Sequence, residues 1–182
     1  MSARSTENGV DLAPGDEPMR AAYEHDLYSW LMEQARHLRA ARWNALDRDN
    51  LAEEIESLGR EQLNKLESAL RVLLLHMLKW DYQPERRGRS WWATIGEQRL
   101  RVDDLLADNP SLRPRVLEAV TRAYRRARLR AVKQTDLDEA RFPRSCPYSW
   151  DDIVSRNFSV RLRAHSTQPE LSAVKIPWNV GP

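Results

Sequence analysis

Residues 49–84 read DNLAEEIESLGREQLNKLESALRVLLLHMLKWDYQP, and this stretch decides the fold. Between Asn50 and Tyr82 it contains no proline and a single glycine, Gly59, so nothing forces a helix to stop. Apolar residues recur every three or four positions, which predicts one buried stripe along a long helix. The stripe comprises Leu51, Ile55, Leu58, Leu66, Leu70, Leu73, Met77 and Trp80. From Val72 to Leu78 the helix is apolar on almost every side, so we expect other helices to surround this end.

The segment before this central helix also has helical periodicity. The pattern begins at Ala21 and fades near Trp43, and Asp47 or Asp49 then offers a side chain that can cap the central helix. A turn near residues 44–45 predicts that the first helix and the central helix form an antiparallel hairpin.

The segments after Pro84 predict further helices. One runs from about Ser90 to Asp108 or Asn109, and the next begins at Pro110 or, because Pro114 follows, somewhat later. Ser149 and Asp152 have the form of a capping box that opens a short last helix. The predicted fold is therefore all-α: a bundle of about four main helices around the long central helix, plus a short C-terminal helix.

Composition divides the chain into a flexible leader (residues 1–20), a helical domain (21–160) and a tail (161–182), in which Ile176, Pro177 and Trp178 could dock on a groove. Cys146 is the single cysteine, which favours a reducing compartment. The densest apolar run is much shorter than the ~20 residues that span a bilayer. We expect a cytoplasmic protein that does not contact membranes.

Ordered residue groups along the chain resemble those of the bacterial family catalogued as domain of unknown function 29. The groups that carry the resemblance are Tyr23, Asp26, Leu27 and Trp30; residues 51–56; His76, Met77, Leu78, Lys79 and Trp80; Arg89, Ser90, Trp91, Thr94, Ile95 and Arg99; Pro110, Ser111 and Leu112; and Phe142, Pro143, Cys146, Pro147 and Tyr148. The resemblance covers about residues 23–160. It implies an all-helical fold and no assigned activity, so it transfers no catalytic residue.

Carboxylates gather at the start of the central helix. Asp49, Glu53 and Glu56 share a helical face, and the expected hairpin brings His37 and Glu33 roughly opposite. Such a set between facing helices can hold a divalent metal, the one cofactor that the sequence suggests. Glu33 and His37 are four apart, however, whereas the usual two-metal pattern has three. The ordinary alternative is that these acids complement the helix dipole and pair with arginines.

His76 and Lys79 lie in the apolar half of the central helix. His76 has either a ligand or proton-transfer role or the ordinary role of a buried histidine that fixes packing, with a partner such as Glu97, Asp103 or Asp104 on the next helix. Lys79 suits the negative end of the helix dipole. Cys146 is more simply explained as a buried anchor than as a nucleophile.

Two basic regions suggest binding. The first is a surface of arginines and tryptophans formed by Arg86, Arg87, Arg89, Trp91, Trp92 and Arg99, residue types favoured at interfaces. The second is the helix after Pro114, which is rich in arginine, although the acids that open the central helix are natural internal partners for it. The net charge of only +2 agrees with such pairing.

We predict a non-enzymatic binding or adaptor module with a protein partner. Nucleic-acid binding and metal-dependent phosphodiester hydrolysis, with Asp49, Glu53 and Glu56 as ligands and Arg89 or Arg99 near the phosphate, remain the alternatives. A homo-oligomer that buries apolar helix faces is also open.

Overall fold

The computed structural model describes residues 23–159, and within this range it contains helices and connecting segments without a β-strand. The all-α prediction is confirmed. The described chain divides into two compact units, and the boundary between them, after residue 60, falls inside the longest helix. The predicted leader and tail, and the predicted docking of Ile176, Pro177 and Trp178, lie outside the described residues.

The first unit is built on α2 (Leu27–Arg39), the 3₁₀ turn η1 (Trp43–Ala45) and the start of α3 (Arg48–Tyr82). Asp26 has a non-helical φ of −150°, and its side chain accepts a hydrogen bond from the Ser29 backbone N–H at 3.0 Å. This N-cap begins α2 and separates it from the helical residues 23–25. Within the described residues, the helical pattern predicted from Ala21 is therefore interrupted at Asp26.

Asp47 caps α3 and ties it to α2. Its carboxylate accepts from the Asn50 backbone N–H at 3.4 Å and from the Trp30 indole N–H at 3.3 Å. Its own backbone N–H donates to the Gln34 side-chain oxygen at 2.9 Å. Farther from the turn, the Tyr23 hydroxyl donates to Glu54 at 2.7 Å. Trp30 and Gln34 thus contact Asp47, whereas Tyr23, earlier in the chain, contacts Glu54, later in the chain. Contacts in this reversed order are those of an antiparallel hairpin, as the sequence predicted.

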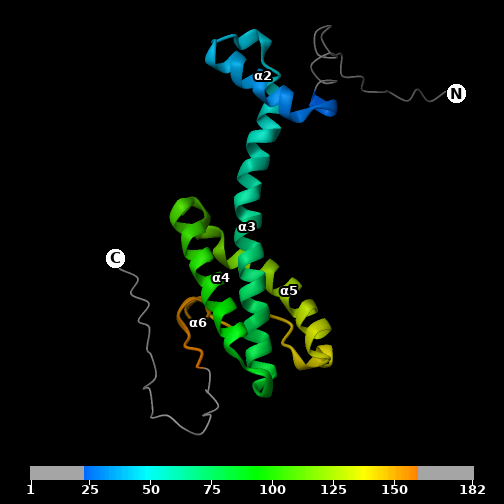
Figure 1. Ribbon diagram of the computed structural model, residues 1–182, viewed down its shortest axis with the longest axis vertical. Coiled ribbons are helices and arrows are strands. Elements are labelled where there is room, and N and C mark those ends of the chain that lie inside the picture. The colour runs from blue at the N-terminus through cyan, green and yellow to red at the C-terminus, as the bar shows by residue number, and fades with distance from the viewer. Residues whose placement is uncertain (1–22, 160–182) are drawn as a thin grey trace, which may run out of the picture. The chain divides into compact units, whose positions relative to one another are not determined.

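The second unit packs the remainder of α3 against α4 (Arg89–Asp108), α5 (Val116–Thr135) and α6 (Trp150–Ser155), which lie around it in Figure 1. Leu66, Leu70, Leu73, Met77 and Leu78 of α3 are completely buried. They join apolar residues of the other three helices in one continuous core. This confirms that other helices surround the apolar half of the central helix.

The N-terminal half of the predicted apolar stripe on α3 is not buried. Ile55 and Leu58 are 61% and 62% exposed, and Leu51 is half-buried. The helical period is present here, but α2 covers the adjoining side of α3 and leaves these residues uncovered. The prediction that Ile55 and Leu58 are buried is wrong within the described chain.

Short 3₁₀ turns join the helices: η2 (Pro84–Arg86), η3 (Pro110–Arg115) and η4 (Glu139–Arg141). Pro114 lies within η3 and α5 begins only after it, so the later start is correct. Both hydrogen bonds of the capping box between Ser149 and Asp152 are present. Across residues 23–159, no helix has the length and apolar character needed to cross a bilayer.

Candidate anion-binding site

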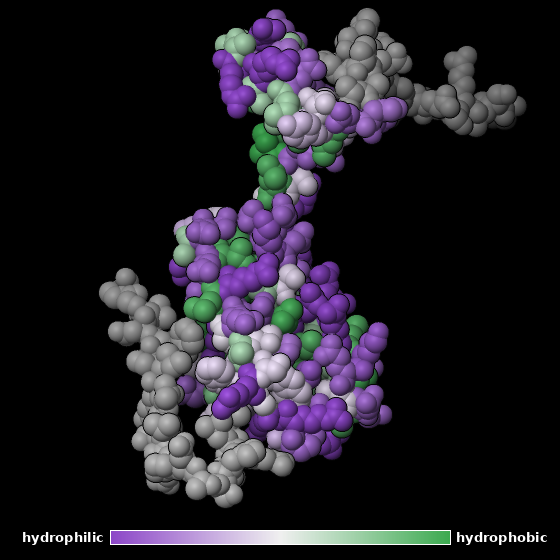
Figure 2. Space-filling view, viewed as in Figure 1, coloured by the Kyte–Doolittle hydropathy of each residue, from purple (hydrophilic) through white to green (hydrophobic). Residues whose placement is uncertain are grey.

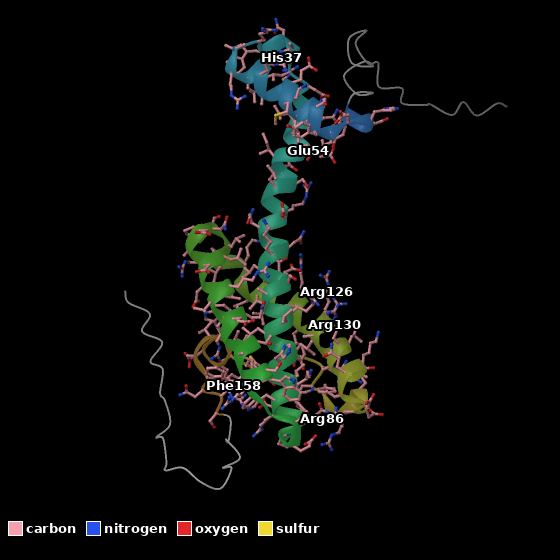
Figure 3. All side chains as sticks on the ribbon, in the orientation of Figure 1. His37, Glu54, Arg86, Arg126, Arg130 and Phe158 are labelled. Carbon is pink, nitrogen blue, oxygen red and sulfur yellow. The ribbon has the colours of Figure 1, made fainter. Side chains whose placement is uncertain are left out.

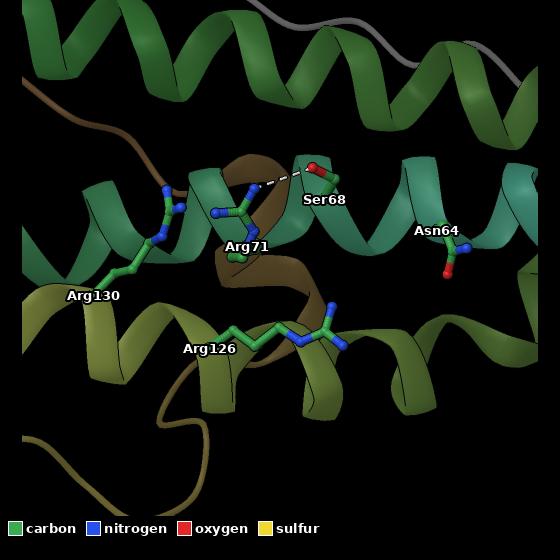
Figure 4. Close-up of a pocket in the computed structure, with 5 residues that line it drawn as sticks. All are labelled: Asn64, Ser68, Arg71, Arg126 and Arg130. Carbon is green, nitrogen blue, oxygen red and sulfur yellow. Dashed lines mark hydrogen bonds between the residues drawn. The ribbon is translucent and has the colours of Figure 1, made fainter.

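An open pocket of about 640 Å³ lies between α3 and α5 in the second unit (Figure 4). It is lined by Asn64, Ser68 and Arg71 of α3 and by Arg126 and Arg130 of α5. Spacings of three and four place these side chains on one face of each helix. Buried core residues occupy other faces of the same two helices, and the packing of this core brings the two polar faces to the same space.

The pocket concentrates positive charge. Arg71 donates to the Ser68 hydroxyl at 3.2 Å, and its pKa is lowered by burial and then by the charges of Arg130 and Arg126. Of the three arginines, only Arg126 has a carboxylate within ion-pair distance among residues 23–159, Glu67 at 3.9 Å. Arg130 has no hydrogen bond or ion pair there. The guanidinium groups repel one another, and a bound anion would relieve that repulsion.

The pocket continues into a basic stripe on α5. The stripe consists of Arg122, Arg126, Arg130 and Lys133, all exposed. Figure 3 shows Arg126 and Arg130 one above the other along α5. Four residues of helix rise about 6 Å, so the stripe presents cations in a row rather than at one point.

The sequence predicted that the acids at the start of α3 would pair with the arginines of α5. The pairs found on α5 are instead Arg122 with Glu67 at 3.3 Å, Arg126 with Glu67 at 3.9 Å, Arg122 with Glu118, and Arg128 with Glu139. The predicted pairing is therefore wrong for these arginines. At the start of α3, Glu54 binds Tyr23, and Glu56 pairs with Arg60 at 3.2 Å.

The predicted surface around residues 86–92 is only partly free. Arg87 donates to the Trp80 carbonyl oxygen at 2.7 Å, which satisfies an acceptor near the end of α3. Trp91 is half-buried, with the Lys79 ammonium 4.6 Å from its ring centre, and Lys79 also donates to Gln134. Burial and then the charge of Arg86 lower the pKa of Lys79. Arg86, Arg89 and Trp92 remain exposed.

Arg99 does not belong to an exposed surface. It is 8% exposed and donates to three carbonyl oxygens at the end of α6, those of Ile153, Arg156 and Asp152, at 2.7, 2.8 and 3.0 Å. Burial, and then the charge of Arg156, lowers its pKa to about 10. Its prediction as a binding-surface residue, or as a group near a substrate phosphate, is wrong because the helix C-terminus occupies all three donor positions.

The predicted metal ligands are not gathered. No three His, Cys, Asp or Glu side chains in residues 23–159 form a group that could hold a metal ion. His37 lies 3.7 Å from Glu33 on its own helix, Asp49 and Glu53 are exposed, and Glu56 pairs with Arg60. Figure 3 shows His37 and Glu54 at different levels of the hairpin, as their helical positions require.

His76 and Cys146 have local hydrogen-bond partners. The His76 Nδ1 lies 2.8 Å from the Val72 carbonyl oxygen of its own helix, so the expected partner on the next helix is wrong. Burial lowers the pKa of His76. The Cys146 thiol lies 3.7 Å from the Tyr148 carbonyl oxygen, and burial raises its pKa. A thiol of raised pKa suits the predicted anchoring role better than that of a nucleophile.

The profile described as "Domain of unknown function DUF29" matches residues 22–159. The chain belongs to the DUF29 family. No match is found among curated proteins or among solved structures.

Several residues that carry the resemblance to DUF29 make the polar contacts of the fold. Tyr23 binds Glu54 between the hairpin helices, and Tyr148 donates to Asp81 at 2.9 Å. Arg99 satisfies the end of α6. In this DUF29 chain, therefore, these parts of the family pattern describe how the helices are held together.

The pocket itself was missed by reasoning from the sequence. Asn64, Ser68 and Arg71 are polar residues at a spacing of four and three within a helix whose other side is apolar. That spacing shows that they share a face. Only the packing of α5 against α3 brings Arg126 and Arg130 to that same face.

Proposed function

We propose that this DUF29 domain is a non-enzymatic binding module whose ligand is nucleic acid, held through phosphate contacts at the arginine pocket and the basic stripe of α5. The observation that carries the proposal is that Arg71, Arg126 and Arg130 line one open pocket, and the only carboxylate within ion-pair distance of them in residues 23–159 is Glu67, 3.9 Å from Arg126. Guanidinium groups bind phosphate with two parallel hydrogen bonds, so arginine suits this ligand better than lysine does.

The shape of the basic region supports a linear polyanion. Arg126, Arg130 and Lys133 continue along α5, whereas a small anion needs only one cluster of donors. Nucleic acid carries regularly spaced charges, and binding gains free energy when its condensed counterions are released. Burial, and then repulsion by Arg130 and Arg126, lowers the pKa of Arg71, and a bound polyanion would offset the repulsion.

The exposed part of the first predicted surface agrees with a nucleic-acid ligand. Arg86, Arg89 and Trp92 are accessible to solvent, and the Trp92 residue is 42% exposed. An exposed indole beside cations can stack on an unpaired base. An adaptor role toward a protein has less support, because Arg87 and Arg99 of that surface have partners within the domain.

Fluorescence anisotropy with labelled single-stranded DNA, single-stranded RNA and duplex DNA, between 50 and 200 mM salt, tests the proposal. The variant Arg126→Gln with Arg130→Gln should weaken binding and reduce the slope of log K against log salt by about 2. The matched control, Arg141→Gln with Arg144→Gln, removes two exposed arginines outside the pocket and should retain the wild-type slope.

Two results would overturn the proposal. One is the absence of salt-dependent binding to every oligonucleotide. The other is an equal loss in both double variants, since binding would then follow net charge rather than the pocket. Unchanged thermal midpoints would show that both variants remain folded.

A further inference from the structure

Exposed hydrophobic residues concentrate on the α2–α3 hairpin. Of the eleven large hydrophobic residues exposed in the described chain, seven lie between residues 27 and 58: Leu27, Tyr28, Met32, Leu38, Trp43, Ile55 and Leu58. Figure 2 shows hydrophobic surface on this unit beside its polar residues. An apolar surface of this kind on a small unit marks an interaction site.

Helical geometry places two apolar stripes on one side of the hairpin. In α2, Trp30 and Gln34 are buried against α3. A rotation of about 60° around the axis of α2 leads from these two residues to a stripe that consists of Leu27, Leu31 and Leu38. Asp47, just before α3, contacts Trp30 of α2, and Glu54 of α3 contacts Tyr23, just before α2; the adjoining stripe of α3 consists of Leu51, Ile55 and Leu58. On each helix, the stripe is rotated in the same sense about the helix axis from the residues that contact the other helix. Because the helices are antiparallel, both stripes face the same side.

The opposite side of α3 is polar. Asp49, Glu53 and Glu56 lie more than a quarter turn away from the Ile55 stripe and are exposed. The hairpin is thus a two-helix layer with one apolar face and one charged edge. Within residues 27–60 it fully buries only Trp30 and Gln34, so it has almost no core of its own. Such a layer is half of a four-helix bundle.

We propose that the apolar face of the hairpin is covered by the same face of a second copy of this chain. The exposed stripe residues Leu27, Leu38, Ile55 and Leu58, with half-buried Leu31 and Leu51, supply roughly half of the ~800 Å² that each partner buries in a standard interface, which is close to the non-polar share of such an interface. A two-fold axis places the stripes of one copy on those of the other, so both copies use the same surface and the assembly ends at the dimer. The repeat of three and four residues on both helices fits another helical layer. No residue of the arginine pocket takes part, so this proposal and the nucleic-acid proposal can fail separately.

Sedimentation equilibrium of the full chain tests this assembly. The wild type should have twice the 21.2 kDa chain mass at tens of micromolar. Ile55→Glu with Leu58→Glu should give the monomer mass with unchanged helical circular dichroism, because both side chains are exposed within one chain. The matched control is Leu117→Glu with Leu129→Glu, at leucines that are 72% and 62% exposed on α5, and it should remain dimeric.

Hydrogen exchange of the wild type supplies a second measurement that needs no variant. On dilution below the dimer dissociation constant, amides of residues 27–58 should exchange faster, while those of residues 66–80 should not change. A wild type that is monomeric at every concentration overturns the proposal. So does an Ile55 and Leu58 variant that keeps the dimer mass, or a control variant that dissociates equally.

Discussion

The carboxylate of Asp81, in the last turn of α3, accepts two hydrogen bonds from the guanidinium of Arg156, at 2.6 and 2.9 Å. The two residues are 75 positions apart, and the contact joins the end of the central helix to the end of α6. The bond to Asp81 raises the pKa of Arg156. Tyr148 donates to the same carboxylate, and burial together with Asp81 raises its pKa above the usual value. This contact holds the C-terminal part of the described domain on the core.

Asp81→Asn should lower the free energy of unfolding by about 1–2 kcal/mol, because an amide keeps the shape but loses the charge and one acceptor. Chemical denaturation measures the change. The control Asp104→Asn removes an exposed carboxylate elsewhere and should cost less than about 0.5 kcal/mol. Equal effects of the two changes would contradict the role given to Asp81.

Arg99→Met should destabilise the domain by about 2–4 kcal/mol, because the three carbonyl oxygens at the end of α6 would lose their donors in a buried place. Urea denaturation provides the measurement. Arg101→Met, at an exposed neighbour, is the matched control. Arg99→Lys should recover only part of the loss, since an ammonium cannot reproduce the planar fork. Full recovery by lysine would show that charge alone matters.

Asp47→Ala should lower the free energy of local opening of the hairpin by about 1–2 kcal/mol, because it removes the N-cap of α3 and leaves the Trp30 indole without its acceptor. Hydrogen exchange of residues 27–58 reports the loosening directly. Asp49→Ala changes a carboxylate two positions away that lies within the first turn, and it should cost only a few tenths of a kcal/mol. A larger effect at Asp49 than at Asp47 would contradict the assigned cap.

His76 should make stability depend on pH. Its folded-state pKa is lowered, mainly by burial, so the unfolded chain binds the proton more readily. The contribution of His76 to the free energy of unfolding is therefore fully present above the pKa of the unfolded chain, about 6.5. It is lost as the pH falls from that value toward the folded-state pKa. The thermal midpoint should therefore fall in acid, and His76→Gln should flatten this dependence relative to the wild type. An NMR titration that places the pKa of His76 at or above 6.5 would contradict this sign.

Much of the fold could be predicted because its determinants are local. The absence of proline from residues 50–82, the position of Pro114 and the pair Ser149 and Asp152 predicted the extent or start of their helices closely. Capping and helical hydrogen bonds join residues only three or four positions apart, so a short window of sequence contains them. The basic character of α5 was visible for the same reason.

The candidate sites depend on contacts between distant positions. The period of α3 is the same at Ile55 and at Leu70, yet one residue is 61% exposed and the other is completely buried. Arg99 and Arg126 are both arginines on helix faces, but one is occupied by the end of α6 and the other faces the pocket. A periodic pattern states which side chains share a face and does not state what covers that face.

The sequence by itself determined that this chain is helical, where its main helices lie, and that it belongs with DUF29, since these properties reside in local spacing and in ordered residue groups. Only the tertiary structure decided that Arg71 joins Arg126 and Arg130, that Asp81 binds Arg156, and that Ile55 and Leu58 stay uncovered. The physical reason is that charge clustering and burial are set by neighbours in space, and those neighbours come from helices more than fifty residues apart.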